Sequence, residues 1–380
     1  MYSPPQEILA SYADLLIHFA LNGGTGVRPG EVVQVMIPDI CKPLYGELQR
    51  AILEANAHPK FHLLATGMNK AFFDIATDEQ LTFFPAQYKR AEAELINHQV
   101  SIIAYDDPQE LKDIDPTRVF KAADAKRDYR DWLFEKEQNG LFSWTLGLYG
   151  TEGMAKEASM TLEEYWQQII QGCYLDARDP VGEWKRLQAE QSRMKRTLDE
   201  LCIESVHIEG DRINLDITIG KNRKWLGGSC RNMPSFELFI SPDWRGTEGT
   251  IYFNQPLYRF GNRLKDVVLE FKQGKVIRAE ASEGLPVLES MIARENADKI
   301  GEFSLTDKRL SRISKLMCNT LYDENIGGEF GNTHIALGRA YRESFTGNPA
   351  NMTPEDWSTL GFNDSPEHTD IISTTDRVVT

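Results

Sequence analysis

The chain has 380 residues, of which 41% are hydrophobic and 26% are charged. This is an ordinary globular composition, and the length predicts two domains with cores that need no disulfide bonds. The formal net charge of −15 would repel phosphate backbones, so we expect no nucleic-acid partner.

The N-terminal segment and the cysteines indicate a cytoplasmic protein. Residues 1–21 lack the basic start and the cleavage site of a signal peptide, and Asp14 and His18 interrupt their apolar pattern as in an amphipathic helix. The five cysteines are odd in number, lie far apart and form no C-x-x-C motif, which is typical of free thiols in a reducing compartment. No run of 18 apolar residues occurs, so we expect no membrane span.

The first half of the chain alternates strand and helix patterns. Runs rich in apolar residues predict strands at residues 31–37, 61–65, 100–105 and 142–149, and helical spacing predicts a helix at residues 44–57. This β-α-β order favours a mostly parallel sheet covered by helices. Residues 1–201 are therefore expected to form an α/β domain that ends in a helical linker.

The linker pattern begins near residue 160. Thr161 followed by Glu164 is a capping-box pattern that predicts the start of a helix. Residues 184–201 are highly charged, with apolar residues at helical spacing, and predict one long exposed helix. We place the domain boundary after Leu201.

Residues 202–380 have a different pattern, in which short alternating runs are separated by turn residues. The predicted strands are residues 205–208, 214–219, 236–240, 249–253, 266–271 and 275–280. Helices are predicted at residues 284–297 and 310–321. This part of the chain is expected to form an α+β domain rich in antiparallel β-structure.

Three patterns resemble known catalytic motifs, but each lacks an essential part. The glycine-rich residues 23–30 lack the Gly-Lys-Ser/Thr end of a phosphate loop and precede a strand, so we expect a turn. His207 and Glu209 match the His-x-Glu of zinc deaminases, but no Pro-Cys-x-x-Cys follows, and a hairpin is expected. Residues 228–230 are not part of a Gly-x-Ser-x-Gly elbow.

Two histidines near the C-terminus stand in unusual segments. His368 and Asp370 form a His-x-Asp pair, and a spacing of two places both side chains on one face of a strand. Imidazole and carboxylate are common ligands of a hydrolytic metal, although this pair alone is a weak signal. His334 opens the segment HIALGRAY.

Three acids also stand out in this part of the sequence: Glu237 is flanked by apolar residues, Glu302 lies in the segment IGEF, and Glu324 lies in the segment TLYDEN. An acid in an apolar run is costly to bury unless it is paired or binds a metal. Taken singly, each acid is more simply explained as a carboxylate on the solvent face of its strand or helix. Three such acids together with two such histidines favour a shared metal site.

Five segments, in this order, make the sequence resemble a known family. They are PSFELFISP with Glu237, Gly301-Glu302, NTLYDEN with Glu324, HIALGRAY with His334, and SPEHTD with His368. The chain resembles the thermophilic-type metallo-aminopeptidases called aminopeptidase T and aminopeptidase S. The resemblance covers nearly the whole chain and is strongest from residues 231 to 370.

This resemblance implies a site for two divalent metal ions with ligands from distant parts of the chain. The implied ligands are Glu237, Glu302, Glu324, His334, His368 and Asp370, and Tyr341 would match the catalytic tyrosine of the family. Residues 326–333 separate Glu324 from His334 by more residues than the family pattern leads us to expect, so Glu329 is an alternative to Glu324. The resemblance also implies a homodimer with active sites that face an enclosed space, and a short β-rich segment after Thr380.

The expected activity is removal of N-terminal residues from peptides that have a free N-terminus. Two bound ions, expected to be zinc, cobalt, manganese or magnesium, would activate a water molecule and polarise the scissile carbonyl. Glu302 or Glu324 would take the proton of the water, and Tyr341 would donate its hydroxyl hydrogen to the oxyanion. A metal-stabilised binding protein without turnover and a metallo-amidase that acts on small amides are the alternatives.

Overall fold

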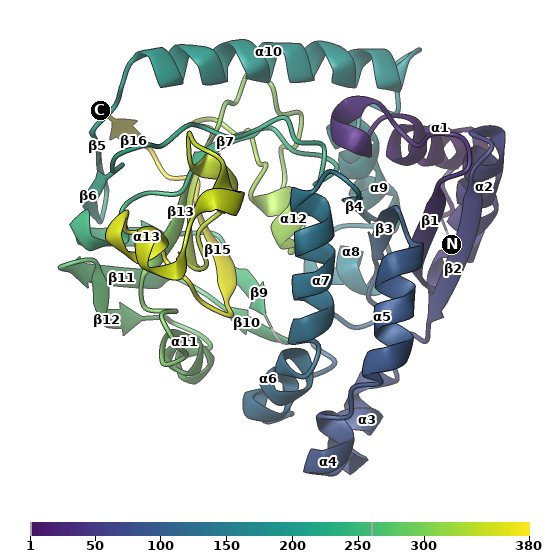
Figure 1. Cartoon of the computed structure of the whole chain (residues 1–380), viewed down its shortest axis with the longest axis horizontal. Coiled ribbons are helices and arrows are strands. Elements are labelled where there is room, and N and C mark those ends of the chain that lie inside the picture. Colours follow the sequence, from purple (N-terminus) through teal and green to yellow (C-terminus); the bar gives the residue numbers. More distant parts are fainter. Residues whose placement is uncertain (1, 260) are drawn as a thin grey trace. The chain divides into compact units, whose positions relative to one another are not determined.

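A computed structural model describes residues 2–259 and 261–380 (Figure 1). Its contacts define two compact units, which are described separately. The N-terminal unit is Met1–Gln188 with Ser229–Ser235, and the C-terminal unit is Ala189–Gly228 with Phe236–Thr380. These units are defined by contacts and do not test whether two domains meet after Leu201. That boundary stays a prediction. No described helix is both long enough and apolar enough to cross a membrane.

The N-terminal unit contains a four-stranded parallel sheet. Its strands are β1 (Val32–Pro38), β2 (His58–Leu64), β3 (His98–Ile103) and β4 (Ser143–Leu148), in the order β2-β1-β3-β4. The predicted α/β class with a parallel sheet is confirmed. The chain first adds β2 on one side of β1 and then places β3 on the other side. This reversal creates a topological switch point at the carboxyl ends of β1 and β3.

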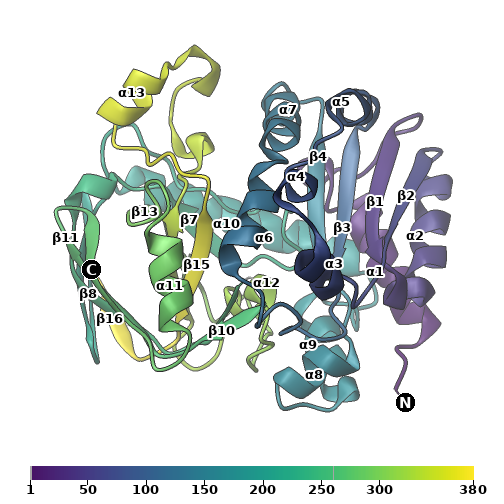
Figure 2. The same ribbon diagram turned by 90° about the horizontal axis from the view of Figure 1, so that it is seen from below.

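One face of this sheet is apolar and is covered by α1 (Gln6–His18) and α2 (Lys42–Glu54) (Figure 2). Val33, Val35 and Ile37 of β1 have no exposed surface. The hydroxyl of Tyr12 in α1 accepts a hydrogen bond from Leu148 N at 2.8 Å and donates one to Leu148 O at 3.2 Å. Apolar packing and this buried pair of hydrogen bonds hold α1 against β4.

The opposite face carries polar side chains, whereas both faces of a parallel sheet are normally apolar. Lys60 Nζ donates to Gln34 Oε1 at 2.7 Å, and Gln34 Nε2 donates to Gln99 Oε1 at 3.4 Å. Gln99 Nε2 in turn donates to Ser101 Oγ at 3.0 Å. A chain of hydrogen bonds therefore crosses the sheet from Lys60 to Ser101. Helices α5 (Ala86–Leu95) and α7 (Arg127–Gln138) lie on this side of the sheet (Figure 2).

Glu92 of α5 is a buried carboxylate that binds two lysines. Its side chain is 2% exposed, and its oxygens accept hydrogen bonds from Lys60 at 2.6 Å and from Lys89 at 2.7 Å. Burial alone would raise the pKa of Glu92, but the two lysines outweigh burial and the pKa lies below its ordinary value of 4.5. The folded state therefore favours the ionised carboxylate. This stabilises the protein above about pH 4.5 and is lost as the pH falls through the lowered pKa.

Replacing Glu92 by glutamine should lower the free energy of unfolding by about 1–3 kcal/mol at pH 7, because two buried charge-assisted hydrogen bonds are lost. The loss should be smaller at pH 3, where the wild-type carboxylate is itself protonated. Urea denaturation at both pH values measures the difference. Asp128→Asn, on the exposed side of α7, is the matched control. An equal loss at both pH values would contradict a role for the charge.

The remaining helices of the N-terminal unit are short, except in the segment that was predicted to be helical. They are α3 (Asn69–Ile75), α4 (Asp78–Leu81), α6 (Pro116–Asp124), α8 (Glu152–Glu157) and α9 (Leu162–Gly172). The predicted capping box is confirmed at the start of α9, where Thr161 and Glu164 each bind the backbone N–H of the other. The predicted long helix is α10 (Pro180–Glu200), which begins in the N-terminal unit and ends in the C-terminal unit.

The C-terminal unit contains two large antiparallel sheets, which Figure 2 shows as separate layers, and a small two-stranded one. The first has the order β12-β11-β8-β6-β5-β16 and consists of β5 (Ser205–Gly210), β6 (Ile213–Thr218), β8 (Thr247–Phe253), β11 (Val267–Lys272), β12 (Lys275–Glu280) and β16 (Arg377–Val379). The second has the order β15-β14-β13-β7 and consists of β7 (Glu237–Ile240), β13 (Ile300–Thr306), β14 (Asn332–Gly338) and β15 (His368–Ser373). The predicted β-rich class is confirmed.

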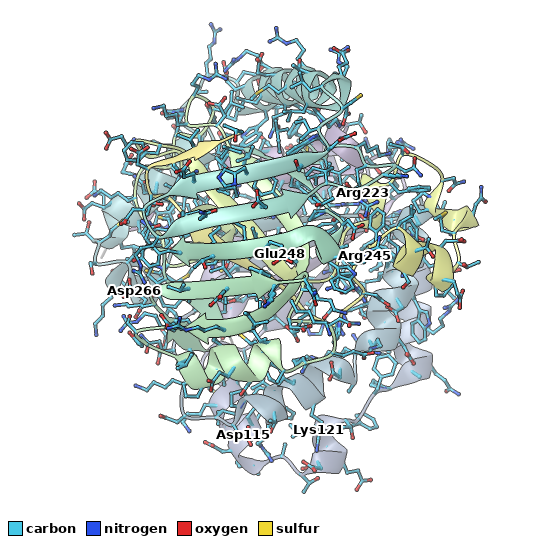
Figure 3. The ribbon with its side chains drawn as sticks, turned by 90° about the vertical axis from the view of Figure 1, so that its left-hand side faces the viewer. Asp115, Lys121, Arg223, Arg245, Glu248 and Asp266 are labelled. Atoms are coloured by element: carbon cyan, nitrogen blue, oxygen red, sulfur yellow. The ribbon has the colours of Figure 1, made fainter. Side chains whose placement is uncertain are left out.

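The two sheets differ in burial. Along β6, Leu215 and Ile217 are buried whereas Asn214 and Asp216 are exposed, so one face of the six-stranded sheet meets solvent. Figure 3 shows this face, with Glu248 upon it. In the four-stranded sheet, every residue of β7 and of β14 is buried. We call this four-stranded sheet the inner sheet and the six-stranded one the outer sheet. Polar side chains in the inner sheet must find partners inside the protein.

Helices are few in the C-terminal unit, and the helix predicted at residues 310–321 is wrong. Only α12 (Thr320–Asp323) forms there. A helix cannot continue through Cys318, whose φ is 54°, so no helix runs from the preceding residues into α12. The carboxylate of Asp323 instead accepts hydrogen bonds from Met317 N at 2.7 Å and Asn319 N at 2.8 Å. The other predicted helix forms as α11 (Leu285–Ile292), and the unit also contains α13 (Pro354–Thr359) and the strands β9 (Leu257–Arg259) and β10 (Asn262–Leu264).

Candidate metal centre

The register of the inner sheet brings several predicted site residues to one face. Residues that lie directly opposite each other on antiparallel strands point to the same face. Glu302 of β13 and Asp370 of β15 both lie opposite Ala336 of β14, and His368 lies opposite Gly338. Three of the predicted ligands are thus gathered around the C-terminal half of β14.

His334 and Glu237 join the same face by the same rule. His334 lies two residues before Ala336 in β14 and opposite Ser304 of β13. Glu237 of β7 lies opposite Thr306, two residues after Ser304. The hydroxyl of Ser304 donates a hydrogen bond to Glu237 Oε2 at 3.3 Å.

Small residues and a bulge make room for these side chains. The pairing of β13 with β14 shifts by one residue between Ile300 and Glu302. A Cβ on the intervening Gly301 would lie 2.4 Å from the carbonyl oxygens of Gly338 and Arg339, so only glycine fits. The bulge turns Glu302 toward the face that carries the histidines.

The side chains form two groups that share Glu302. His334 Nε2 lies 3.2 Å from Glu237 Oε2 and 3.4 Å from Glu302 Oε1. His368 Nε2 lies 3.2 Å from Glu302 Oε2 and 3.4 Å from Asp370 Oδ1. In each group, three ligand atoms lie within 4.8 Å of one another, which is a spacing that can hold a metal ion. Glu302 directs one oxygen to each histidine.

Hydrogen bonds to the second ring nitrogen orient both imidazoles. Nδ1–H of His368 donates a hydrogen bond to the carbonyl oxygen of Arg339 at 2.8 Å, so Nε2 is the ring nitrogen that is available to a metal ion. Nδ1 of His334 lies 3.5 Å from Asn332 Oδ1. The amide of Asn332 is itself held, since its Nδ2 donates to two backbone carbonyls, one of them that of Ile326. Both Nε2 atoms are therefore presented to the acids, as in metal sites with ordered histidine ligands.

The donors fit a divalent ion. Nε2 of His334 is buried and makes no hydrogen bond, although oxygens of Glu237 and Glu302 lie within 3.4 Å. Burying several carboxylates with so little compensating positive charge is unfavourable without a cation. The mixture of imidazole nitrogens and carboxylate oxygens suits zinc, cobalt or manganese better than calcium.

Burial and mutual repulsion shift the pKa values of the cluster. Burial, followed by the charges of Glu237 and Asp370, raises the pKa of Glu324 well above its ordinary value. Burial would lower the pKa of His334, but Glu237 and Glu302 raise it. Burial would raise the pKa of Asp370, but His368 lowers it to about 2. A divalent cation would compete with the protons that this cluster holds.

The two alternatives for the sixth ligand lie in different surroundings. Glu324 is 4% exposed and interacts electrostatically with the cluster, and Asn325 Nδ2 donates to its Oε1 at 3.5 Å. Glu329 is exposed, and its backbone carbonyl accepts a hydrogen bond from Lys308. The structure thus brings Glu324, and not Glu329, to the cluster.

Tyr341 lies beside the histidine at the other end of the cluster. Its ring is 4.9 Å from that of His368, at an angle of 67°, and 5.4 Å from that of Phe239. Its backbone N–H donates to Ser241 Oγ at 2.8 Å. The structure therefore brings all seven predicted residues to one region of the C-terminal unit, while their chemical roles stay predictions.

Comparison with known proteins identifies the family. The model of the thermophilic metalloprotease family (M29) matches residues 5–380. The chain belongs to this family. The predicted family and the predicted enzyme class, a metal-dependent peptide hydrolase, are confirmed.

Relatives of this chain carry aminopeptidase names. Aminopeptidase PepS of Streptococcus thermophilus is 27% identical over 393 residues, which cover 97% of the chain and 92% of that protein. Aminopeptidase T of Thermus aquaticus is 28% identical over 287 residues, which cover 70% of the chain and 68% of that protein. The structure of wild-type AmpT from Thermus thermophilus has a TM-score of 0.83 at 21% identity and covers 98% of the chain and 94% of that structure, which shows a shared fold.

Sequence reasoning missed the residues that support the candidate metal centre. Ser304 and Asn332 lie two residues from Glu302 and His334 on the same strands, so each points to the same face as its neighbour. The signal was available, because a polar residue two positions from a ligand on a buried strand is costly without a role. Arg339 acts through its backbone carbonyl, for which side-chain chemistry gives no signal.

Replacing Glu324 by glutamine should weaken metal binding by about 10–100-fold, the usual cost of changing a group at or next to a metal. Glu329→Gln is the matched control and should leave metal affinity unchanged, because its side chain is exposed. Titration of the metal-free protein with zinc, followed by competition with a chromogenic chelator, measures both affinities. The reverse order of effects would assign Glu329 to the site.

Proposed function

We propose that this protein is a cytoplasmic, homodimeric aminopeptidase that uses two divalent metal ions to remove N-terminal residues from peptides. The observation that carries this proposal is the position of Glu302, with one oxygen 3.4 Å from His334 and the other 3.2 Å from His368. A carboxylate in this position can bridge two neighbouring ions.

The charges of the cluster support two ions. Four carboxylates, those of Glu237, Glu302, Glu324 and Asp370, would offset the four positive charges of two divalent ions. Glu237 and His334 would bind one ion, Asp370 and His368 the other, and Glu302 both. Zinc, cobalt, manganese or magnesium would fill these sites, with nitrogen ligands favouring the first three.

The side chains of the cluster can move the protons that peptide hydrolysis requires. Bound metal ions would supply an acidified water and polarise the scissile carbonyl. Glu324 is in neither three-residue group, so it, or Glu302, can take the proton of the attacking water and pass it to the leaving amine. Tyr341, against His368, can donate its hydroxyl hydrogen to the developing oxyanion.

A free amino terminus gives the substrate a positive charge that suits this acidic cluster. The ammonium of a peptide can pair with a carboxylate that is not fully engaged with metal, which would position the first peptide bond for cleavage. An acetylated N-terminus has no such charge. The aminopeptidase names of the relatives support the same choice of substrate.

Surface features of the N-terminal unit support the proposed dimer. Leu63, Met68, Phe72, Ile75 and Phe83 are all at least 50% exposed and lie within 21 residues of each other, which is unusual for a surface that meets only water. The strand β2 lies at the edge of its sheet. The five cysteines form no disulfide bond with one another, which supports a reducing compartment such as the cytoplasm.

Hydrolysis of leucine p-nitroanilide by purified protein tests the proposed function. We expect activity with added zinc, cobalt, manganese or magnesium, and excess chelator should stop it. N-acetyl-leucine p-nitroanilide should not be cleaved. Activity that persists in excess chelator would reject the proposal. Cleavage of the acetylated substrate would favour an amidase, and bound metal without hydrolysis would favour a binding protein.

A further inference from the structure

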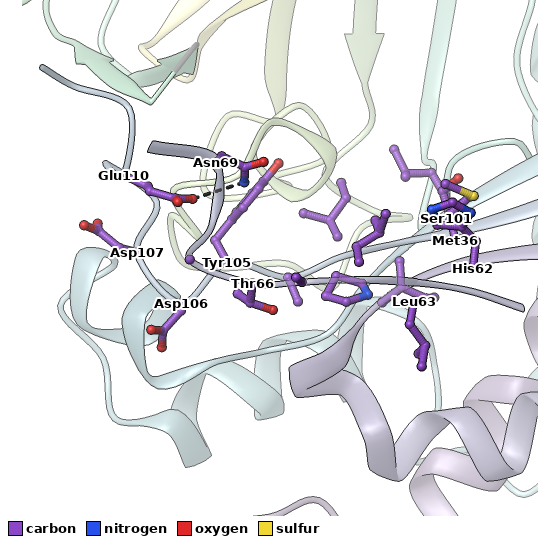
Figure 4. A pocket seen from close by; sticks show the side chains of 18 of the residues that line it. Met36, His62, Leu63, Thr66, Asn69, Ser101, Tyr105, Asp106, Asp107 and Glu110 are labelled. Atoms are coloured by element: carbon purple, nitrogen blue, oxygen red, sulfur yellow. Dashed lines mark hydrogen bonds between the residues drawn. The ribbon is translucent and has the colours of Figure 1, made fainter. Parts of the chain in front are cut away.

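Acidic side chains outside the candidate metal centre differ in whether water can solvate them. At one end of a cavity of about 610 Å³ in the N-terminal unit, Figure 4 shows Asp106, Asp107 and Glu110. Asp106 and Asp107 are exposed, so their charges need no partner in the protein. Glu367 of the C-terminal unit has a side chain that is only 7% exposed. This buried charge directly precedes His368, so it lies next to the candidate metal centre.

Two arginines pair with Glu367. Arg294 Nε lies 2.8 Å from Glu367 Oε1, and Arg259 Nη2 donates a hydrogen bond to Oε2 at 3.4 Å. Arg294 follows α11, and Arg259 is the last residue of β9. Removing one member of a buried pair is costly, because the remaining charge loses its partner. The carboxylate therefore ties β9 and the end of α11 to the start of β15.

Arg259 also binds the backbone of a candidate ligand. Its Nη2 donates a second hydrogen bond, at 3.3 Å, to the carbonyl oxygen of His368. One nitrogen thus contacts the carboxylate of Glu367 and the backbone of the next residue. A guanidinium is planar and always charged, so it can hold both acceptors in a fixed geometry. This contact fixes the start of β15 at the residue that carries the imidazole.

The backbone of Glu367 completes the link to that imidazole. Its carbonyl oxygen accepts a hydrogen bond from Arg339 N at 2.6 Å, and the carbonyl oxygen of Arg339 accepts one from His368 Nδ1 at 2.8 Å. A Cβ on Gly338 would lie 2.2 Å from the carbonyl oxygen of Glu367, an approach that only glycine allows. Glu367 thus holds Arg339, and Arg339 orients the ring of His368.

Groups that orient a metal ligand affect how tightly the metal binds. A histidine ligand usually donates its second ring N–H to an acceptor, and loss of such outer partners typically lowers metal affinity by about 10–100-fold. For His368 the acceptor is a backbone carbonyl, which a substitution cannot remove. The side chains that hold this part of the backbone are therefore the ones that substitution can test.

We propose that Glu367 is a positioning residue, which holds the backbone that aligns Nε2 of His368 on its ion. Arg259 and Arg294 keep Glu367 in place by pairing with its buried charge. Glu367 would not contact the ion itself, since it belongs to neither three-residue ligand group. The inference rests on the proposed function in one respect, because it requires an ion at His368.

The effect of Glu367 should be confined to one of the two ions. The ring of His334 is oriented by Asn332, whose amide is held by the backbone carbonyls of Glu324 and Ile326. The contacts of Glu367 lead to Arg339 and not to this group. Loss of the charge at Glu367 should therefore weaken the ion at His368 and spare the ion at His334.

Glu367→Gln removes the charge and keeps the shape of the side chain. The full-length, metal-free protein with ¹³C-labelled histidines can be followed by NMR in zinc buffers set by a chelator, which gives a zinc affinity at each ring. We expect the affinity at His368 to fall by about 10–100-fold and the affinity at His334 to stay unchanged. Glu283→Gln is the matched control, since Glu283 pairs with Arg263 at 3.0 Å, and it should change neither affinity.

A second variant keeps the test valid if Glu367→Gln does not fold. The side chain of Arg259 is 36% exposed, so Arg259→Ala is a milder change, and it should weaken the ion at His368 in the same way. Arg259→Lys keeps a charge for the carboxylate and should restore part of the affinity. Combining Arg259→Ala with Glu367→Gln should cost less than the product of the two single effects, because both act through one contact.

The kinetics distinguish a positioning residue from a catalytic one. Glu367 touches no reacting atom in this proposal, so kcat of Glu367→Gln should recover to nearly the wild-type value when zinc saturates the site. A variant that binds zinc at His368 as tightly as the wild type would overturn the proposal. An equal loss of affinity at His334 and His368 would also overturn it, because that result indicates general destabilisation.

Failure of the proposed function would be recognised separately. A wild type that binds zinc at both histidines but hydrolyses no peptide would reject the aminopeptidase, while a selective loss at His368 in Glu367→Gln would still support the positioning role. A wild type that binds zinc at His334 alone would overturn both proposals.

Discussion

Glu302→Gln is expected to lower kcat/KM for leucine p-nitroanilide by about 10²–10⁴-fold. Glu302 is the residue common to both three-residue groups, and each of its oxygens lies within 3.4 Å of a histidine. Glutamine keeps the shape of the side chain but replaces one oxygen by an NH₂ group, which cannot serve as a ligand and repels a cation. One substitution thus damages both groups at once.

The metal content of the same variant should fall, because the shared ligand is lost. Elemental analysis of dialysed Glu302→Gln protein measures this, and circular dichroism checks that the sheet remains. Glu329→Gln carries the same chemical change on the surface and should keep both activity and metal. A Glu302→Gln enzyme with wild-type activity would show that Glu302 has no part in the reaction.

Tyr341→Phe should lower kcat by about 10²–10³-fold, since the loss of one donor to an oxyanion typically costs about 2.7–4 kcal/mol. Phenylalanine keeps the ring that packs against His368 and Phe239 and removes only the hydroxyl. The KM and the bound metal should therefore change little. Steady-state kinetics with elemental analysis separate this result from damage to the metal centre, and an unchanged kcat would rule out the hydroxyl as a donor.

The first domain shows how well periodicity predicts strands that are apolar and regular. The strands predicted at residues 31–37, 100–105 and 142–149 form β1, β3 and β4, and every end lies within one or two residues of the prediction. The alternating strands of the outer sheet were predicted for the same reason, since their polar and apolar residues follow the pleat. Gln34 was an exception inside β1, where it belongs to the hydrogen-bonded polar face of the sheet.

The inner sheet was harder to predict because it carries the site. Strands β13, β14 and β15 are mostly buried, yet they contain Glu302, His334 and Asp370, which break the apolar pattern. Strand register depends on contacts between distant segments, which one sequence does not reveal. The site residues themselves were predictable, because buried polar residues need a reason and the family pattern supplied one.

The helix predicted at residues 310–321 failed for a local reason. Apolar residues such as Leu310, Ile313 and Met317 have helical spacing, and that spacing was the basis of the prediction. Asp323 instead binds the backbone N–H groups of Met317 and Asn319, and this alternative cannot be recognised from periodicity.

Five of the six candidate ligands, all except Glu324, belong to four strands, β7, β13, β14 and β15, that are separated by long stretches of chain. An ion held between them would act as a crosslink across the whole inner sheet. Detachment of any one strand would release the ion, so the centre cannot survive partial melting of that sheet. Heat resistance of this unit would then rise with the free metal concentration, by RT ln(1 + [L]/Kd) for each site.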